Sequence, residues 1–266
     1  RRRGEWEEAT KSFERGLKLN PLGSEDWLTL GEHHIWMRKY DEAAKCFERS
    51  VAQNPDAGVG YLWLAHVYIC LDRDKVRAQR TIKDAYENAN FETITNNEFK
   101  AVHRIVTFQN REISNAMEGE ADHTILAGLY ETRGEPDLAH LHFDSLRVEV
   151  EQRIANNSGL TPQAELWHGD LGVAQAALGN KDEAIRSGRY AVERFPLDKD
   201  ALFAFLALEN LAEIYVRTGE HDAAIDQLEI LLSIPSNMSA GVLMLDPIWD
   251  PLRNYPRFTE LVANSP

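Results

Sequence analysis

The chain has 266 residues, of which 43% are hydrophobic and 27% are charged, and its net charge is −14. These proportions are typical of a soluble globular protein with a substantial core. The negative charge argues against binding to nucleic acid or to an anionic membrane, because both require a basic face. The longest apolar run, 201–208, is far shorter than the ~20 residues that span a bilayer.

The first predicted elements belong to an internal repeat. The stretch GEWEEATKSFERGLKLNP (4–21) aligns with RKYDEAAKCFERSVAQNP (38–55), so that Trp6 falls on Tyr40 and Phe13 on Phe47. Each copy predicts the second helix of a pair, closed by a proline that cannot continue the helix. Between the two copies, small residues such as Gly31 allow the paired helices to approach closely.

Further copies follow along the chain, and no stretch has the period-two alternation of a strand. One segment allows two interpretations: 96–118 is either a short, degenerate repeat or part of one continuous helix over 97–117. The predicted organisation of the single solenoid 1–266 is a half repeat at 4–21, repeats at 24–57, 58–92, 96–118, 120–157, 165–198 and 201–235, and a cap at 245–262.

The cap is predicted from a proline-rich, apolar ending, LDPIWDPLRNYPRF. Asp246 is placed to N-cap a short helix that has Pro247 at its first position. Trp249, Leu252 and Phe258 would then cover the last apolar face of the repeat array. At the other end the chain opens inside a repeat, so we expect it to be a fragment of a longer protein.

The repeat, with W-x2-L-G followed by alanine, an aromatic residue and a closing proline, resembles the tetratricopeptide repeat. The resemblance implies an all-α, right-handed superhelix of antiparallel helix pairs. Residues 120–262, including LENLAEIYVRTGEHDAAIDQLEILLSIPS, also resemble the C-terminal region of bacterial multidomain signalling proteins. Those proteins carry this region behind a serine/threonine kinase, an adenylate cyclase or a winged-helix domain, none of which is found in these residues.

The sequence gives no indication of an enzyme, a cofactor site or a metal site. The pairs His33–His34 and His140–His142 point to different sides of a helix, so neither forms the i, i+4 pair that favours metal binding. The two cysteines, at 46 and 70, have no zinc-ligand spacing and are expected to be free and buried.

The candidate site is the concave groove that the resemblance implies, lined by the first helix of each repeat. The chaperone-type carboxylate clamp is absent, because glutamate, leucine and histidine occupy its positions. An alternative is that Trp36, Trp63 and Ile35 only pack between repeats. The groove residues are Glu25, Leu28, Glu32, Ile35, Trp36, Trp63, His66, Ile69, Glu209, Asn210, Glu213 and Arg217, with Cys70 in the same register.

The expected function is therefore a non-catalytic protein–protein interaction module that binds a protein or peptide in its groove. The acidic and apolar groove residues predict a ligand with Lys or Arg near large apolar side chains. The alternative is a regulatory or structural arm of a larger bacterial signalling protein. We expect no nucleic-acid partner and no membrane insertion. The cytoplasm is the favoured compartment, with an extracytoplasmic location if a transmembrane segment lies upstream.

Overall fold

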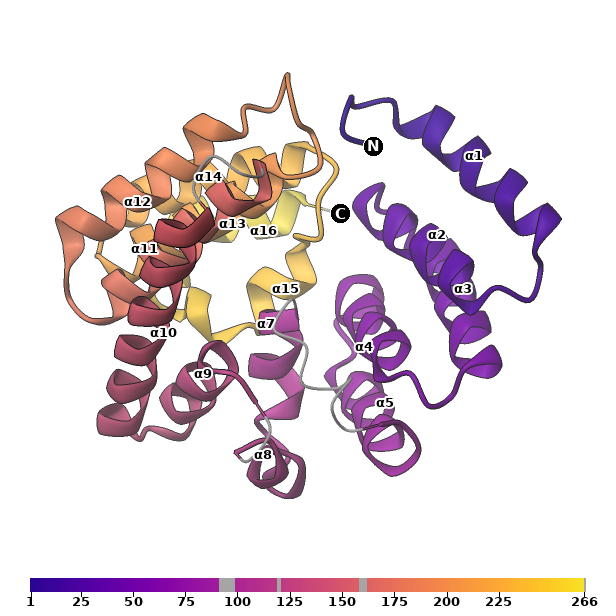
Figure 1. Cartoon of the computed structure of the whole chain (residues 1–266), viewed down its shortest axis with the longest axis horizontal. Coiled ribbons are helices and arrows are strands. Elements are labelled where there is room, and N and C mark those ends of the chain that lie inside the picture. The colour runs from indigo at the N-terminus through magenta and orange to yellow at the C-terminus, as the bar shows by residue number, and fades with distance from the viewer. Residues whose placement is uncertain (91–98, 119–120, 158–161, 266) are drawn as a thin grey trace. The chain divides into compact units, whose positions relative to one another are not determined.

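The computed structural model describes residues 1–90, 99–118, 121–157 and 162–265, and within these ranges the chain forms helices and no strand (Figure 1). Helices that are adjacent in sequence pack as pairs. The prediction of an all-α fold of paired helices is thus confirmed. Among the described residues, no helix is both long and apolar enough to cross a membrane.

The chain divides into two compact units. The N-terminal unit comprises residues 5–133 and Ser236–Pro247, and the C-terminal unit comprises residues 1–4, 134–235 and 248–265. The chain therefore leaves the C-terminal unit after Pro235 and returns to it at Ile248. The extent of a single solenoid over 1–266 stays a prediction.

In the N-terminal unit, the helices at the start of the chain pack on one another in chain order. In order, its elements are α1 (Trp6–Leu19), α2 (Ser24–Trp36), α3 (Tyr40–Gln53), α4 (Gly58–Asp72), α5 (Lys75–Asn88), α7 (Lys100–Val102), the π-helix η2 (His103–Thr107), α8 (Arg111–Met117), α9 (His123–Arg133) and α15 (Ala240–Leu245). Helix α2 packs on α3 and α4 packs on α5, as the repeat pattern predicts.

A glycine allows the close approach of α2 and α3. A Cβ atom at Gly31 would lie 2.5 Å from Cε1 of Phe47, whose ring is fully buried. Any side chain at this position would push the two helices apart, because the ring is enclosed and cannot move away. The W-x2-L-G pattern therefore has a direct packing reason in this pair.

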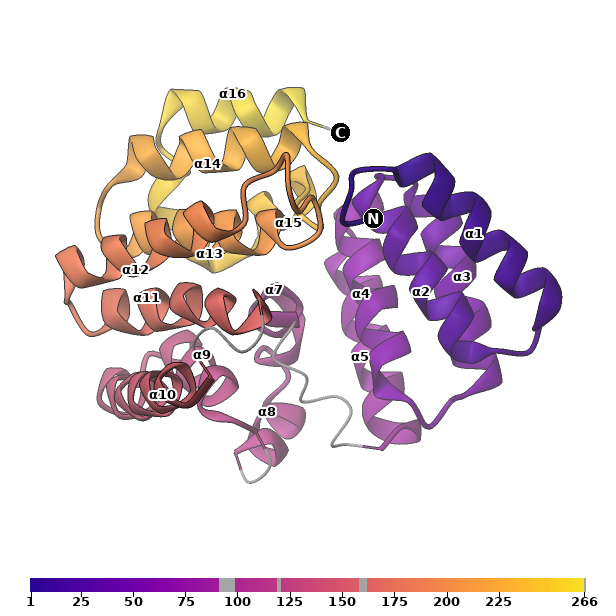
Figure 2. The same ribbon diagram turned by 45° about the horizontal axis from the view of Figure 1, so that its top comes forward.

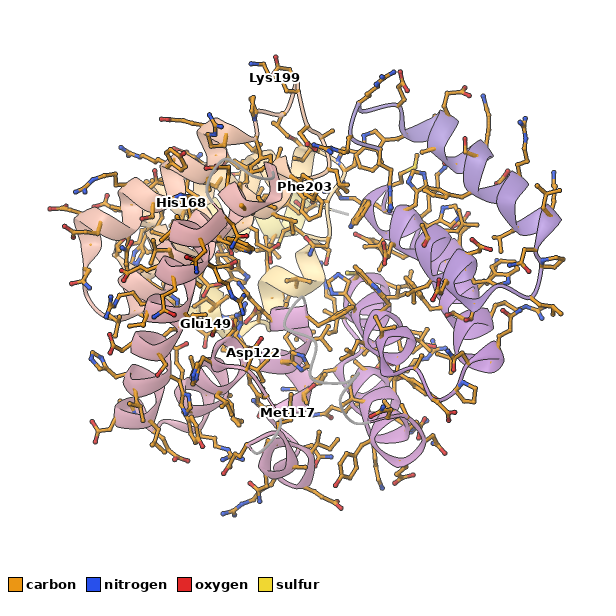
Figure 3. All side chains as sticks on the ribbon, in the orientation of Figure 1. Met117, Asp122, Glu149, His168, Lys199 and Phe203 are labelled. Atoms are coloured by element: carbon orange, nitrogen blue, oxygen red, sulfur yellow. The ribbon has the colours of Figure 1, made fainter. Side chains whose placement is uncertain are left out.

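The degenerate segment turns after η2. Asn110 N-caps α8, since its Oδ1 atom accepts hydrogen bonds from the backbone N of Glu112 at 3.1 Å and of Ile113 at 3.2 Å. Met117 ends α8 as a fully buried side chain, and Asp122 Oδ1 accepts from the N of Ile125 at the start of α9 (Figure 3). The described part is thus two short helical pieces and not one helix over 97–117; residues 96–98 and 119–120 lie outside the described residues.

The C-terminal unit continues the pairing. Its elements are α10 (Pro136–Asn157), the 3-10 helix η3 (Pro162–Leu166), α11 (Trp167–Ala177), α12 (Lys181–Arg194), α13 (Ala204–Arg217), α14 (His221–Ser233), the 3-10 helix η4 (Pro247–Leu252, its first residue in the other unit) and α16 (Pro256–Asn264). His168 on α11, labelled in Figure 3, lies against Tyr190, with ring centroids 4.4 Å apart. The first residues of the chain join this unit through Arg2, which pairs with Asp200 at 2.6 Å and lies over the Phe203 ring.

The ending of the chain packs on α14. Trp249, Leu252 and Phe258 are buried, with Trp249 only 1% exposed. The guanidinium of Arg257 in α16 contacts two α14 carboxylates at 2.6 and 2.7 Å. The sequence predicts Asp246 as the N-cap of the short helix that begins at Pro247; in the structure both of its carboxylate oxygens accept hydrogen bonds from Arg104.

Candidate functional site

A segment from near the C-terminus lies against the first helices of the N-terminal unit. We call Ser236–Pro247 the internal segment; it contains the six-residue helix α15, which packs on α4. Both views of the ribbon place α15 beside α4 and α7 (Figures 1 and 2). The surface that it contacts, which we call the segment-binding face, is made by Trp36, His66, Ile69, Cys70 and Arg104.

The first half of the internal segment is held by its backbone and by one hydroxyl group. The N–H of Ser236 donates to the carbonyl oxygen of Trp36 at 3.1 Å. His66 Nε2 donates to the carbonyl oxygen of Asn237 at 3.1 Å. The Ser239 hydroxyl contacts the Cys70 sulfur at 3.3 Å and also N-caps α15. These contacts fix the register of the segment on α2 and α4.

The second half is held by a buried ion pair. Arg104 Nε and one of its terminal nitrogens donate to the two carboxylate oxygens of Asp246, each at 2.7 Å. The side chains are 9% and 1% exposed. A bidentate pair of this kind fixes orientation as well as position. Removing either partner would leave the other charge buried without this compensation, which costs several kcal/mol.

Between these two halves the backbones touch directly. A Cβ atom at Gly241 would lie 2.0 Å from the carbonyl oxygen of Ile69 and 3.4 Å from Cα of Cys70. Because the first neighbour is backbone within α4, no rotamer change relieves the contact. Position 241 therefore accepts glycine alone in this docked arrangement.

Burial keeps two polar side chains of α4, His66 and Cys70, uncharged. It lowers the pKa of His66 to about 4, although the hydrogen bond to Asn237 acts in the opposite direction. It raises the pKa of Cys70 to about 12, partly opposed by the contact with Ser239. At neutral pH, His66 is thus an uncharged N–H donor and Cys70 an unreactive thiol.

Three of the groove residues predicted on α2 and α4 contact the internal segment: Trp36 through its carbonyl group, His66 and Ile69. Along the rest of α2, Glu25 is exposed while Leu28 and Glu32 are half-buried. Ile35 is fully buried. The assignment of this set to a ligand groove stays a prediction.

The Trp63 ring packs within the repeats. It stacks on Phe47 of α3 with centroids 5.7 Å apart and an interplanar angle of 3°, and it meets the edge of Phe99 at 4.8 Å. The Trp36 ring meets Trp6 of α1 in an edge-to-face arrangement at 6.1 Å. These contacts favour the packing interpretation for the two indole rings.

The remaining predicted residues lie on α13, in the C-terminal unit. Glu213 and Arg217 pair with each other at 2.9 Å, and both side chains are buried. The guanidinium of Arg217 also lies over the Phe143 ring at 5.2 Å. Asn210 packs on Gly169, and Glu209 is half-buried beside it. The charge of Glu213 is therefore compensated within its own helix, which weakens the predicted acidity of this part.

Sequence reasoning missed Arg104 and the internal segment. One signal for Arg104 is present: an arginine inside the apolar stretch VHRIV (102–106) requires an acidic partner if that stretch is buried. The segment SNMSAGVLMLDP offers no comparable signal. In the described part of the chain, no group of three His, Cys, Asp or Glu residues is placed to hold a metal ion.

Comparison with known families identifies the repeat. Residues 24–57 match a family model described as tetratricopeptide repeat, and residues 170–237 match a second model with the same description. These matches cover α2 and α3 in one unit and α11 to α14 in the other. Over these two stretches the chain thus matches the tetratricopeptide repeat. No curated protein is significantly similar to it.

Several solved structures are similar at low sequence identity. YrrB, described as a TPR protein with an unusual peptide-binding site, is 12% identical over 94% of this chain and 97% of its own, with a TM-score of 0.31. The APC/C hetero-tetramer Cut9–Hcn1 is 16% identical over 98% of this chain, with a TM-score of 0.48, and this chain covers 46% of its matched chain. A tetratricopeptide repeat protein from Parabacteroides merdae is 17% identical over 98% of this chain and 92% of its own, with a TM-score of 0.31.

Proposed function

We propose that the chain is a non-catalytic module that binds a protein or peptide segment on the segment-binding face of its N-terminal unit. The observation that carries this proposal is that the face already holds a peptide segment. The face binds this segment through groups that recognise peptides: a backbone carbonyl at Trp36, a ring donor at His66 and a guanidinium at Arg104. Such groups recognise main chain and carboxylate without any reaction.

A ligand that extends along α2 would meet an acidic region. Glu25 is exposed and Glu32 half-buried, with Leu28 between them on the helix. Their field favours a Lys or Arg next to an apolar side chain in the ligand, as the sequence predicts. The proposed partner is therefore basic and apolar where it contacts α2.

A second candidate function is a regulatory or structural arm of a larger bacterial signalling protein. The observation that favours it is the same docked segment, because a face that is permanently closed by its own chain offers nothing to an external ligand. The two functions differ in one measurable property, the binding of peptides by the isolated chain.

Peptide-array binding tests the leading function. We expect the wild-type chain to select peptides that combine basic and large apolar residues, and Glu32→Lys to weaken their binding at least tenfold. Glu193→Lys, which makes the same charge change at an exposed position of α12, should have no such effect. Equal binding by the two variants would place the site elsewhere, and the absence of any binding would favour the arm.

A further inference from the structure

The internal segment is a discrete piece of chain. It begins after the last helix of a repeat in the C-terminal unit, α14, and ends where η4 returns to that unit. Its own regular structure is the six residues of α15. Within the C-terminal unit, α14 packs on α13 and on α16 without any part of the internal segment.

We propose that the internal segment is a displaceable resident ligand, and that the external partner of this face carries the same chemistry. That chemistry is a glycine among small residues, two apolar residues directly after it, and a carboxylate at the position of Asp246. This inference rests on the proposed function and specifies the ligand of the same face.

The glycine requirement follows from the contact with α4. The carbonyl oxygen of Ile69 lies where a side chain at Gly241 would begin. A partner that adopts the same path therefore needs glycine at this point. The two residues that precede it in the internal segment, Ser239 and Ala240, are also small. The next two residues, Val242 and Leu243, are buried, so a partner must supply apolar side chains there.

The carboxylate requirement follows from Arg104. When the internal segment leaves, the guanidinium loses the Asp246 oxygens that it binds in a buried position. A partner without an anion there would leave a desolvated charge without this compensation. The neutral donor His66 adds a second requirement, a backbone carbonyl near the start of the ligand.

The covalent attachment of the internal segment determines how strongly it competes with a free peptide for the segment-binding face. A segment joined to its binding site by short connections has an effective concentration of ~mM. A free peptide with the same contacts therefore binds the wild-type chain weakly. A natural partner has to add contacts that the internal segment lacks, and the exposed Glu25 end of α2 offers them to a basic residue.

Two altered chains open the face for a test. Gly241→Val introduces the clash with Ile69, and a second chain replaces residues 236–247 with a Gly/Ser linker of the same length. The probe is a fluorescent peptide of residues 235–248, PSNMSAGVLMLDPI. We expect both opened chains to bind it at least tenfold more tightly than wild type and to melt at a higher temperature in its presence.

Matched peptides test the specified chemistry. A valine in place of the glycine, or a lysine in place of the aspartate, should each reduce binding to the opened chains at least tenfold. Equal binding of all three peptides would overturn the proposal, because the contacts at Ile69 and Arg104 would not be selecting the ligand.

Other results of these experiments would also overturn the proposal. Opened chains that keep their helical circular dichroism and ignore the peptide would overturn the proposal, as would chains that unfold and are not rescued by it. Wild-type dimers that exchange the segment would assign the face to a second copy instead of an external partner. An array peptide that binds wild type along α2, beside the internal segment and without releasing it, would preserve peptide binding by the N-terminal unit and overturn this inference alone.

Discussion

Single residues in the turns between paired helices adopt left-handed backbone conformations. Gly134, Gly179 and Gly219 have φ values of 71°, 83° and 79°, which suit glycine. Arg38 and Arg73 occupy the same region, with φ of 56° and 54°. A residue with a Cβ atom pays about 1–2 kcal/mol for this conformation.

Arg73→Gly should therefore stabilise the chain. Arg73 is exposed and ends α4. The gain is reduced by the greater freedom of glycine in the unfolded chain, so we expect a net increase of about 0.5–1 kcal/mol in the free energy of unfolding. Chemical denaturation measures it. Arg80→Gly, at an exposed position inside α5, should instead lower the free energy of unfolding by about 1 kcal/mol. A lower free energy of unfolding in both variants would contradict this explanation.

His66 makes stability depend on pH. Its pKa is lowered from 6.5 to about 4 by burial, so the unfolded chain takes up the proton first as the pH falls. Its contribution is complete above about pH 6.5 and is lost as the pH falls toward 4; the shift corresponds to about 3 kcal/mol at most. We expect His66→Gln, which keeps a donor without titrating, to lose less stability over this range.

Urea titrations at pH 7 and at pH 4.5 measure this difference. The carboxylates that titrate at lower pH are the same in both chains, so the comparison isolates His66. Parallel losses in wild type and His66→Gln would show that the imidazole is not held neutral in the folded chain.

At the scale of the helix, local patterns account for most of what could be predicted. The pairing of α2 with α3 follows from residues within one repeat, such as Gly31 and Phe47, which meet in the structure. The sequence of 96–118 left two interpretations open, a short repeat with a turn or one continuous helix, because this segment has few of the residues that define the repeat. Asp246 shows the limit of local reasoning: its position before Pro247 predicts a cap, but the partner of its carboxylate lies far away in sequence.

The chain ending offers a test at this scale. Trp249 is fully buried, so Trp249→Ala should lower the free energy of unfolding by about 3–5 kcal/mol and loosen α14 first. Thermal and chemical denaturation measure the loss. Leu22→Ala, at a side chain that is 81% exposed, should change stability by less than about 0.5 kcal/mol. Equal effects of the two substitutions would contradict the packing of this ending.

At the scale of the whole molecule, the candidate site was predicted only in part. The register of the repeat placed His66, Ile69 and Cys70 together on one face, and each of them contacts the internal segment. That the internal segment covers this face could not be predicted, because residues 66 and 237 are separated by 171 positions and no periodic pattern connects them. Arg104 was missed because the repeat is degenerate there.

Native-state hydrogen exchange tests the central claim most directly, because it shows whether the internal segment can leave its face while the helices beneath it stay folded. The backbone N–H groups of Leu243 and Asp246 donate to the carbonyl oxygens of Ser239 and Val242, in and next to α15, and can be followed against those of α4. We predict that the α15 amides exchange by local opening, with a lower free energy than the α4 amides, which require global unfolding. Exchange of both sets at the same free energy would show that the segment is a fixed part of the fold and would contradict the account.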